Sequence, residues 1–174
     1  MNRFTSTFPR LETERLILRP LGHEDFPAMA EFYGSERSRF VGGIVDPAKA
    51  WRQLATEIGH WTLRGYGRFG VELREGSSLV GVIGPWFPHG WPEPELGWDL
   101  MAGFEGKGYA SEAARATRDW AYGSLGWTTA ISLVAPENKA SEAVAKRLGC
   151  TYECDIEHAT AGHVSIWRHP GPDA

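Results

Sequence analysis

The first third of the chain combines one strand-like run with two helical patterns of apolar residues. The run RLILRP at residues 15–20 predicts a strand, which its final proline ends because proline cannot donate to a sheet. Apolar residues at spacings of three and four over residues 26–33 and 51–58 predict two amphipathic helices. The second of these is expected to begin at Asp46-Pro47, a capping residue followed by a proline suited to the first turn.

The middle of the chain changes to strand-like patterns followed by a helix. Residues 67–75 and 78–87 predict two strands, joined by a tight turn at Gly76-Ser77-Ser78. A third strand is expected over residues 95–101, after a loop that contains several prolines. The alanine-rich segment over residues 111–122 predicts a helix, whose small side chains allow close packing on a sheet.

The last third predicts a further strand, a helix and two closing strands. Residues 131–135 form the strand, and the helix follows Asn138 and ends at Gly149, a residue type that commonly terminates helices. The closing strands are expected over residues 151–157 and 163–169. Early strands pair as hairpins and later strands are joined through helices, so the order of elements predicts an α+β fold with a mixed sheet.

Size and charge narrow the class of protein. The chain has 174 residues, of which 42% are hydrophobic, so we expect one domain over residues 1–174. The formal net charge of -4, with no run of like charges, argues against nucleic acid and membrane surfaces as partners. No segment is apolar enough for a secretory leader or a membrane span, which predicts a cytoplasmic protein. Cys150 and Cys154 stand too far apart in a predicted strand for a disulfide, so free thiols are expected.

Three glycines, Gly103, Gly106 and Gly108, precede the helix predicted over residues 111–122. Glycines ahead of a helix N-terminus let several main-chain N–H groups converge on an anion, which the helix dipole also favours. The spacing fits neither of two well-known phosphate loops. The Walker pattern lacks its first glycine and its hydroxyl residue, and the dinucleotide pattern requires a different glycine spacing within a parallel unit.

The glycine loop and the helix after it carry a resemblance to a known enzyme family. Two stretches of the chain resemble the GNAT superfamily of N-acetyltransferases, in particular its RimJ/RimL-like branch of ribosomal-protein N-terminal acetyltransferases. They are ELGWDLMAGFEGKGYASEAARATRDWAY and ISLVAPENKASEAVAKRLG. The resemblance extends over about residues 10–168, and its most specific part is the pairing of G-K-G-Y-A with a downstream Asn-x-x-Ser. It implies a mostly antiparallel sheet of about seven strands with helices on both faces.

The resemblance implies acetyl-CoA as a co-substrate and suggests how it is held. The pyrophosphate would lie on main-chain N–H groups of the glycine loop, and pantetheine would lie between the strands at 95–101 and 131–135, which splay apart in the family. The implied contact residues are Leu100, Met101, Glu105, Gly106, Lys107, Gly108, Tyr109, Ala110 and Asn138. The family places Gln or Arg where this chain has Glu105, and a carboxylate beside a diphosphate weakens coenzyme binding unless it points to solvent.

Acetyl transfer to an amine requires a general base, because amines are protonated near neutral pH. Glu95 is the candidate base, directly or through water, and Glu93 is the alternative two residues earlier. Many relatives protonate the leaving thiolate with a tyrosine, but Ala145 stands at that position, so the resemblance gives the role to Ser141. A main-chain N–H near Met101 is expected to polarise the carbonyl, and transfer is expected to be direct within a ternary complex.

The sequence leaves the acceptor open among a protein N-terminus, a small amine or amino acid, and an aminoglycoside-like compound. Trp86 and Trp91 are candidates for the wall of the acceptor pocket, whereas Trp98 is expected in the core. The family also suggests a homodimer. We expect no metal, because the spacings of the histidines near Cys154 match no zinc site; these are His158, His163 and His169.

The same residues are compatible with two different functions. A non-catalytic acyl-CoA or nucleotide-binding module with this fold would account for Glu105 and for the missing tyrosine at position 145. The second alternative function is a dinucleotide-dependent enzyme, but the spacing of the glycines argues against it. Asn138 and Ser141 are also good helix caps. Four basic residues are candidates either for phosphate contact or for solvated surface: Lys107, Arg115, Lys139 and Arg147.

Overall fold

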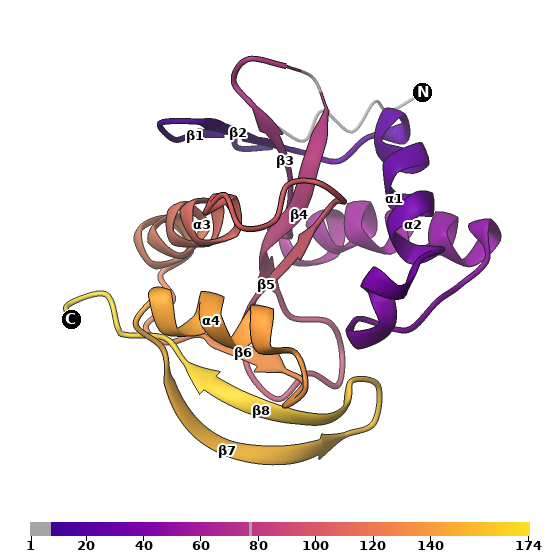
Figure 1. Ribbon diagram of the computed structural model, residues 1–174. Coiled ribbons are helices and arrows are strands. Elements are labelled where there is room, and N and C mark those ends of the chain that lie inside the picture. Colours follow the sequence, from indigo (N-terminus) through magenta and orange to yellow (C-terminus); the bar gives the residue numbers. More distant parts are fainter. Residues whose placement is uncertain (1–7, 77) are drawn as a thin grey trace.

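The computed structural model describes residues 8–76 and 78–174, which form a mixed sheet flanked by helices (Figure 1). In chain order the elements are β1 (Leu11–Glu12), β2 (Leu16–Arg19), η1 (His23–Asp25), α1 (Phe26–Tyr33), η2 (Glu36–Phe40), α2 (Pro47–Arg64), β3 (Phe69–Leu73), β4 (Leu79–Trp86), β5 (Glu95–Leu100), α3 (Tyr109–Leu125), β6 (Ile131–Val134), α4 (Lys139–Arg147), β7 (Thr151–His158) and β8 (Gly162–Arg168). The turn expected at Gly76-Ser77-Ser78 includes Ser77, which lies outside the described residues.

The strands follow the order β1-β2-β3-β4-β5-β6-β8-β7 across the sheet. Every neighbouring pair is antiparallel except β5 and β6, which run parallel. The expectation of an α+β fold with a mixed, mostly antiparallel sheet is therefore confirmed. The described sheet has eight strands rather than about seven, because Leu11 and Glu12 pair with β2 as a short additional edge strand.

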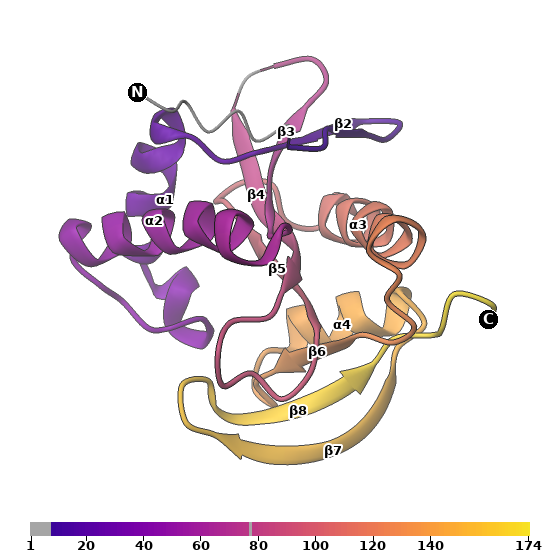
Figure 2. The same ribbon diagram turned by 180° about the vertical axis from the view of Figure 1, so that it is seen from behind.

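Helices cover both faces of the sheet, as Figures 1 and 2 show. The helices α1 and α2 lie on one face, and α3 and α4 lie on the other. A hydrophobic core fills the space on each side. The core beneath α3 includes Leu16, Leu18, Val71, Val80, Ala113 and Ala114, and the core beneath α1 includes Met29, Phe32, Leu54, Val82 and Met101. None of the described helices is both long and apolar enough to span a membrane.

The helix boundaries have local causes. Asp46 caps α2 by accepting a hydrogen bond from the Lys49 N–H (2.9 Å), and Gly65 ends this helix with a φ of 77°. The helix α3 begins at Tyr109, two residues before the predicted start. Gly108, with its left-handed backbone, provides the turn into the helix, so the last glycine of the loop also marks the helix boundary.

β5 and β6 diverge soon after they begin, and this divergence positions the site. Glu95 and Ile131 are the only residues paired in register between these two strands. Beyond that pair, the Glu95 carboxylate accepts a hydrogen bond from the Leu133 N–H (3.0 Å), and the Ser132 hydroxyl donates one to the Leu96 carbonyl (2.7 Å). These side chains satisfy main-chain groups that a continuous parallel ladder would have used. The two strands therefore stay apart without leaving those groups unpaired.

Two glycines provide a matched test of the packing between β4 and β5. A Cβ on Gly81 would lie 2.4 Å from the main-chain oxygen of Asp99, whereas a Cβ on Gly123, within α3, would meet no atom within 4 Å. We expect Gly81→Ala to destabilise the fold by about 1–3 kcal/mol through overpacking. Gly123→Ala should stabilise it by about 0.5–1 kcal/mol, because alanine is ordered in a helix at lower entropic cost. Urea denaturation measures both, and a neutral Gly81→Ala would contradict this packing.

Candidate active site

The loop between β5 and α3 turns through three glycines. Gly103, Gly106 and Gly108 have φ angles of 85°, 72° and 83°, in a region that other residues adopt only at a cost. The first intrahelical hydrogen bond of α3 runs from the Glu112 N–H to the Gly108 carbonyl (3.1 Å). Within the part of the chain that the structure describes, the N–H groups of residues 106–111 have no internal acceptor. The loop therefore presents a series of free donors at the positive end of a helix dipole.

An arginine just before β2 braces this loop. Arg15 donates from Nε to the Glu112 carboxylate (2.7 Å) and from Nη1 to the Lys107 carbonyl (2.9 Å). Its guanidinium lies over the Tyr109 ring, 4.7 Å from the ring centroid. The Thr13 hydroxyl also donates to Glu112 (2.6 Å). These contacts tie the loop to the β1–β2 turn and hold its shape without using the free N–H groups.

Glu105 has a partner that neutralises its charge. The Arg37 guanidinium forms an ion pair with the Glu105 carboxylate and donates a second hydrogen bond to the Leu100 carbonyl (2.9 Å). Burial alone would raise the pKa of Glu105, but main-chain N–H groups of Glu105 and Gly103 and the charge of Arg37 outweigh it, so this pKa lies below its usual value. Glu105 is therefore a compensated charge beside the free N–H groups of residues 106–111.

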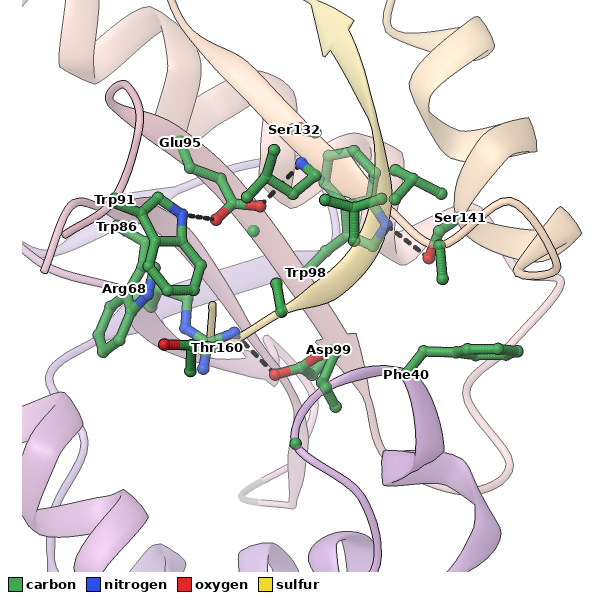
Figure 3. A pocket seen from close by; sticks show the side chains of 18 of the residues that line it. Phe40, Arg68, Trp86, Trp91, Glu95, Trp98, Asp99, Ser132, Ser141 and Thr160 are labelled. Carbon is green, nitrogen blue, oxygen red and sulfur yellow. Dashed lines mark hydrogen bonds and ion pairs between the residues drawn. The ribbon is translucent and has the colours of Figure 1, made fainter. Parts of the chain in front are cut away.

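A cavity of about 390 Å³ lies where β5 and β6 diverge (Figure 3). It brings together three residues that are distant in sequence, Glu95, Asn138 and Ser141. Trp86 and Trp91, the expected wall residues, also line it. The glycine loop lies beyond its lining, at the far end of β5. The site thus divides into a loop with free N–H groups and a cavity with ionisable and hydroxyl side chains.

Glu95 lines this cavity from the first position of β5. Its carboxylate accepts hydrogen bonds from the Trp91 indole (2.5 Å) and from the Leu133 N–H (3.0 Å), and the residue is only 7% exposed. Burial raises the pKa of Glu95 above its usual value, although both hydrogen bonds and the charge of Arg68 oppose the shift. A carboxylate with a raised pKa that faces a cavity is suited to accept a proton near neutral pH.

Glu93 lies in a different environment. The Arg168 guanidinium holds its carboxylate through two hydrogen bonds of 2.5 and 2.8 Å. This pairing lowers the pKa of Glu93, and the residue does not line the cavity. A carboxylate that is already paired with an arginine is a weak base, so the geometry favours Glu95 over Glu93 for proton transfer.

Ser141 lies in the first turn of α4, on the opposite side of the cavity from Glu95 (Figure 3). Its hydroxyl oxygen accepts a hydrogen bond from the Trp98 indole (3.2 Å), which leaves the hydroxyl proton available for donation. Asn138 caps α4 through its Oδ1, which accepts from the Ser141 N–H (3.2 Å), and its amide nitrogen has no acceptor among the residues that the structure describes. Trp98 packs against the core beneath α3 and also lines the cavity.

The expectation of a free N–H at Met101 needs correction. This N–H donates to the Val80 carbonyl (2.9 Å) in the ladder with β4. Main-chain groups alternate along a strand, so those of Trp98 and Leu100 face the gap beside β6 instead. Leu100 agrees with this alternation, because its carbonyl accepts a hydrogen bond from the Arg37 side chain of η2 and not from β4. A main-chain donor toward the gap must therefore come from Trp98 or Leu100.

A family profile described as an acetyltransferase (GNAT) domain matches residues 15–151, which include the glycine loop, Glu95 and Ser141. This chain belongs to the GNAT acetyltransferase family. An acetyltransferase crystal structure from Agrobacterium tumefaciens has 39% sequence identity and a TM-score of 0.87, covering 98% of this chain and 99% of that one. The N-acetyltransferase YoaA of Bacillus subtilis, itself uncharacterized, is 27% identical over 152 residues and covers 82% of both chains. The protein is therefore an N-acetyltransferase.

Solved structures of the RimL type share this fold. A ribosomal L7/L12 N-terminal acetyltransferase RimL in complex with coenzyme A has a TM-score of 0.75 at 17% identity, covering 95% of this chain and 100% of that one. A putative ribosomal-protein-serine acetyltransferase from Vibrio cholerae has a TM-score of 0.78 at 22% identity, covering 96% and 100%. At these identities the likeness concerns the architecture alone.

The acetyltransferase holds a buried charge cluster on the cavity floor that the sequence pattern did not reveal. Arg68 donates from Nε to Glu57 (3.2 Å), forms a second contact with the same carboxylate, and donates from Nη1 to Asp99 (2.7 Å). Its guanidinium also lies 5.2 Å from the Trp86 ring. His60 stacks on the same ring with centroids 4.6 Å apart. Trp86 is therefore held between two side chains and forms a fixed wall.

A second chain of contacts supports the divergence of β5 and β6. The Ser132 hydroxyl donates to the Leu96 carbonyl and lies 2.9 Å from Nε2 of His169. His169 is 3% exposed, and burial, with the charges of Arg118 and Arg168, lowers its pKa to about 3. The imidazole is therefore neutral. Nε2 donates to Ser132, because the serine proton is already used for Leu96.

The remaining candidates have ordinary partners. Lys107 donates to the Gly103 carbonyl (2.8 Å), and Lys139 pairs with Glu142 (2.9 Å). Arg115 lines a separate surface depression near the start of α3. No group of three or more His, Cys, Asp or Glu among residues 8–76 and 78–174 is arranged to hold a metal ion.

Arg68 compensates two buried carboxylates, so its removal should be costly. We expect Arg68→Met to destabilise the fold by about 3–5 kcal/mol near neutral pH. Without the guanidinium, which opposes the effect of burial on the pKa of Asp99, burial favours the protonated form of this carboxyl group. The folded state of the variant then binds protons more tightly than the unfolded state, so the loss grows as pH rises. Urea denaturation at about pH 5.5 and about pH 8 measures this dependence.

Arg74→Met is the matched control for this prediction. Arg74 forms an exposed pair with Glu12, whose side chain is 47% exposed. Such a pair contributes at most about 1 kcal/mol, so the control variant should differ little from wild type at either pH. A loss for Arg68→Met that shrinks as pH rises would contradict the role of Arg68 in compensating the charge of buried Asp99.

Proposed function

We propose that this acetyltransferase moves an acetyl group from acetyl-CoA directly to a primary amine within a ternary complex. The observation that carries the proposal is the cavity at the divergence of β5 and β6, where Glu95 and Ser141 face the same space. A base and a proton donor on opposite sides of one gap are what direct transfer between an amine and a thioester requires. No covalent enzyme intermediate is needed.

The loop before α3 is suited to an anionic coenzyme. The free N–H groups of residues 106–111 and the helix dipole favour a diphosphate at this point. The Ser111 hydroxyl is a further donor, because it is buried without a partner among the described residues. Arg37 neutralises Glu105, which removes the main electrostatic objection to a diphosphate beside that carboxylate. We expect Lys107, Tyr109 and Ala110 to contribute their N–H groups.

The gap between β5 and β6 is the expected place of the pantetheine arm. Main-chain groups of Leu100 and Trp98 face this gap, whereas Met101 contributes its side chain to the core beneath α1. The free amide nitrogen of Asn138 is the corresponding donor on the side of α4. A thioester at the end of such an arm would reach the cavity between Glu95 and Ser141.

Proton transfer follows from the two side chains on the cavity wall. Glu95 accepts the proton of the acceptor ammonium, directly or through water, and its raised pKa suits this role. The neutral amine then forms the new bond from nitrogen to the acetyl carbon, and the bond from carbon to sulfur breaks. Ser141 donates its hydroxyl proton to the leaving thiolate, since the Trp98 indole already satisfies the serine oxygen. The second proton that the nitrogen loses on forming the amide passes to Ser141, directly or through water, and restores its hydroxyl.

Glu95→Gln tests the role of the base. A glutamine cannot accept the proton, so kcat should fall by about 10²–10⁴-fold while binding of CoA is retained. Wild-type kcat should rise with pH as Glu95 ionises, and the variant should lose this limb of the profile. Thiol release with a primary amine measures kcat, and calorimetry measures CoA binding.

Glu93→Gln is the control, because its carboxylate is paired with Arg168 outside the cavity and the variant should turn over close to the wild-type rate. A Glu95→Gln enzyme with wild-type kcat across the pH range would exclude Glu95 as the base. Loss of CoA binding in the same variant would point to a structural role through Leu133 instead.

The pairing of Arg37 with Glu105 yields a double-mutant prediction. Arg37→Ala leaves an unpaired carboxylate beside the proposed diphosphate, so the Kd for CoA should rise about tenfold, equivalent to about 1.4 kcal/mol. Adding Glu105→Gln should restore most of the affinity, because the repelling charge is gone. Calorimetry measures the Kd for CoA of the wild type, Arg37→Ala and the double variant, with Arg74→Ala as a distant control. A double variant as weak as Arg37→Ala would mean that Arg37 contacts the coenzyme itself.

A further inference from the structure

The cavity has two sides of different character. Residues of β6, of α4 and of the turn between them form the side on which the pantetheine arm is proposed to lie, including Ala135, Asn138 and Ser141. The other side lies toward α1 and α2, where Asp99 and Arg68 form the floor and Phe40 and Trp86 the walls (Figure 3). The acceptor must enter from this second side, because the proposed base, Glu95, points the same way along β5 as Asp99.

The acceptor side carries an excess of negative charge. Among the described residues that line the cavity, Arg68 is the one Lys or Arg, and Glu95 and Asp99 are the acidic residues. Glu57 lies directly behind Arg68 and is fully buried. Three carboxylates thus face one guanidinium, which leaves two uncompensated negative charges when all are ionised. Burial raises the pKa values of both Glu95 and Asp99, although the charge of Arg68 opposes the shift in each.

Arg68 offers little to an anionic acceptor, because buried carboxylates already engage three of its five N–H donors. Glu57 takes two of its donors and Asp99 takes a third, and the guanidinium stacks over Trp86. A carboxylate on the acceptor would meet a guanidinium that two buried acids already overcompensate. At the effective dielectric of a protein interior, the repulsion between this carboxylate and the buried acids is strong enough to favour an acceptor that has no carboxylate.

Apolar side chains form much of the wall on this side, next to the polar side chains of Gln53 and Thr56 from α2. The apolar lining comes from two stretches of the chain, with Phe40 and Val41 in the first and Trp86, Pro88 and Trp91 in the second. Trp86 is fixed between His60 and Arg68, so its ring offers a rigid surface. The whole cavity, including the space for the thioester, measures about 390 Å³, which suits a compact acceptor.

We propose that the acceptor is a small primary amine with an apolar body and no carboxylate beside the amine, and that Glu57, Asp99 and Glu95 together exclude amines that carry one. This inference rests on the proposed function, since it describes the acceptor of the same transfer. It narrows the acceptor, because free amino acids are then poor substrates.

The test compares acceptors of one shape that differ in charge. Phenethylamine, phenylalanine amide and phenylalanine share the same ring, and a tripeptide amide beginning with phenylalanine represents a protein N-terminus. We expect kcat/KM for phenethylamine and phenylalanine amide to exceed that for phenylalanine by at least about tenfold. Phenethylamine is more basic than phenylalanine, so a preference for it does not arise from a larger neutral fraction.

Each contrary outcome overturns part of the proposal. Phenylalanine accepted as well as phenethylamine would exclude selection against a carboxylate while leaving the transferase function intact. A tripeptide amide preferred over phenethylamine by more than about tenfold would make a protein N-terminus the acceptor. No turnover with any of the four overturns the inference, and the proposed function fails with it only if calorimetry also detects no binding of CoA.

Two variants test whether the buried carboxylates cause the preference for phenethylamine over phenylalanine. Asp99→Asn and Glu57→Gln each remove one negative charge, the first facing the cavity and the second behind Arg68. Either should reduce the preference for phenethylamine over phenylalanine several-fold. Glu31→Gln, an exposed position on α1, is the control with an unchanged ratio. Folded variants that keep the wild-type ratio would show that these carboxylates do not select the acceptor. If neither variant folds, the wild-type ratio alone decides.

Discussion

The parting of β5 from β6 after the single pair of Glu95 and Ile131 is the constraint on which the rest of the structure depends. A parallel pair that continued would consume the main-chain groups of both strands and close the centre of the sheet. Instead, the Glu95 carboxylate and the Ser132 hydroxyl bind the main-chain N–H of Leu133 and carbonyl of Leu96 where the two strands diverge. The neutral imidazole of His169 supports Ser132 from behind. The Glu95 carboxylate thus stabilises the divergence of β5 and β6 and also faces the cavity that this divergence creates.

The two ends of this gap have opposite electrostatic character. At the loop end, the free N–H groups of residues 106–111 and the pairing of Glu105 with Arg37 create a place for negative charge. At the cavity end, buried carboxylates outnumber the guanidinium of Arg68. An anionic coenzyme and a cationic amine would therefore be drawn to opposite ends and meet between the strands. The chain needs no large net charge for this, which is why a value of -4 indicated neither partner.

The order of elements was readable from the sequence because most strands and helices have clear apolar periodicity. The glycine loop was found for a similar reason, since three glycines before a helix require an unusual backbone. The pairing of Arg37 with Glu105 and of Arg68 with Asp99 was not predictable, because each joins residues from different parts of the chain. The commitment of the Met101 N–H to β4 depends on strand register, which the local sequence does not encode.

Amide hydrogen exchange, measured residue by residue with and without CoA, tests most directly whether the gap between β5 and β6 and the glycine loop before α3 hold the coenzyme. Among residues 8–76 and 78–174, no acceptor is found for the N–H groups of residues 106–111 and of Leu100. These groups should exchange quickly in the free protein and then slow markedly when CoA is bound. Met101 should be protected in both states, because its N–H is bonded to Val80, and it serves as the internal reference. Loop amides that are already protected without CoA, or that exchange unchanged at saturating CoA, would contradict this arrangement.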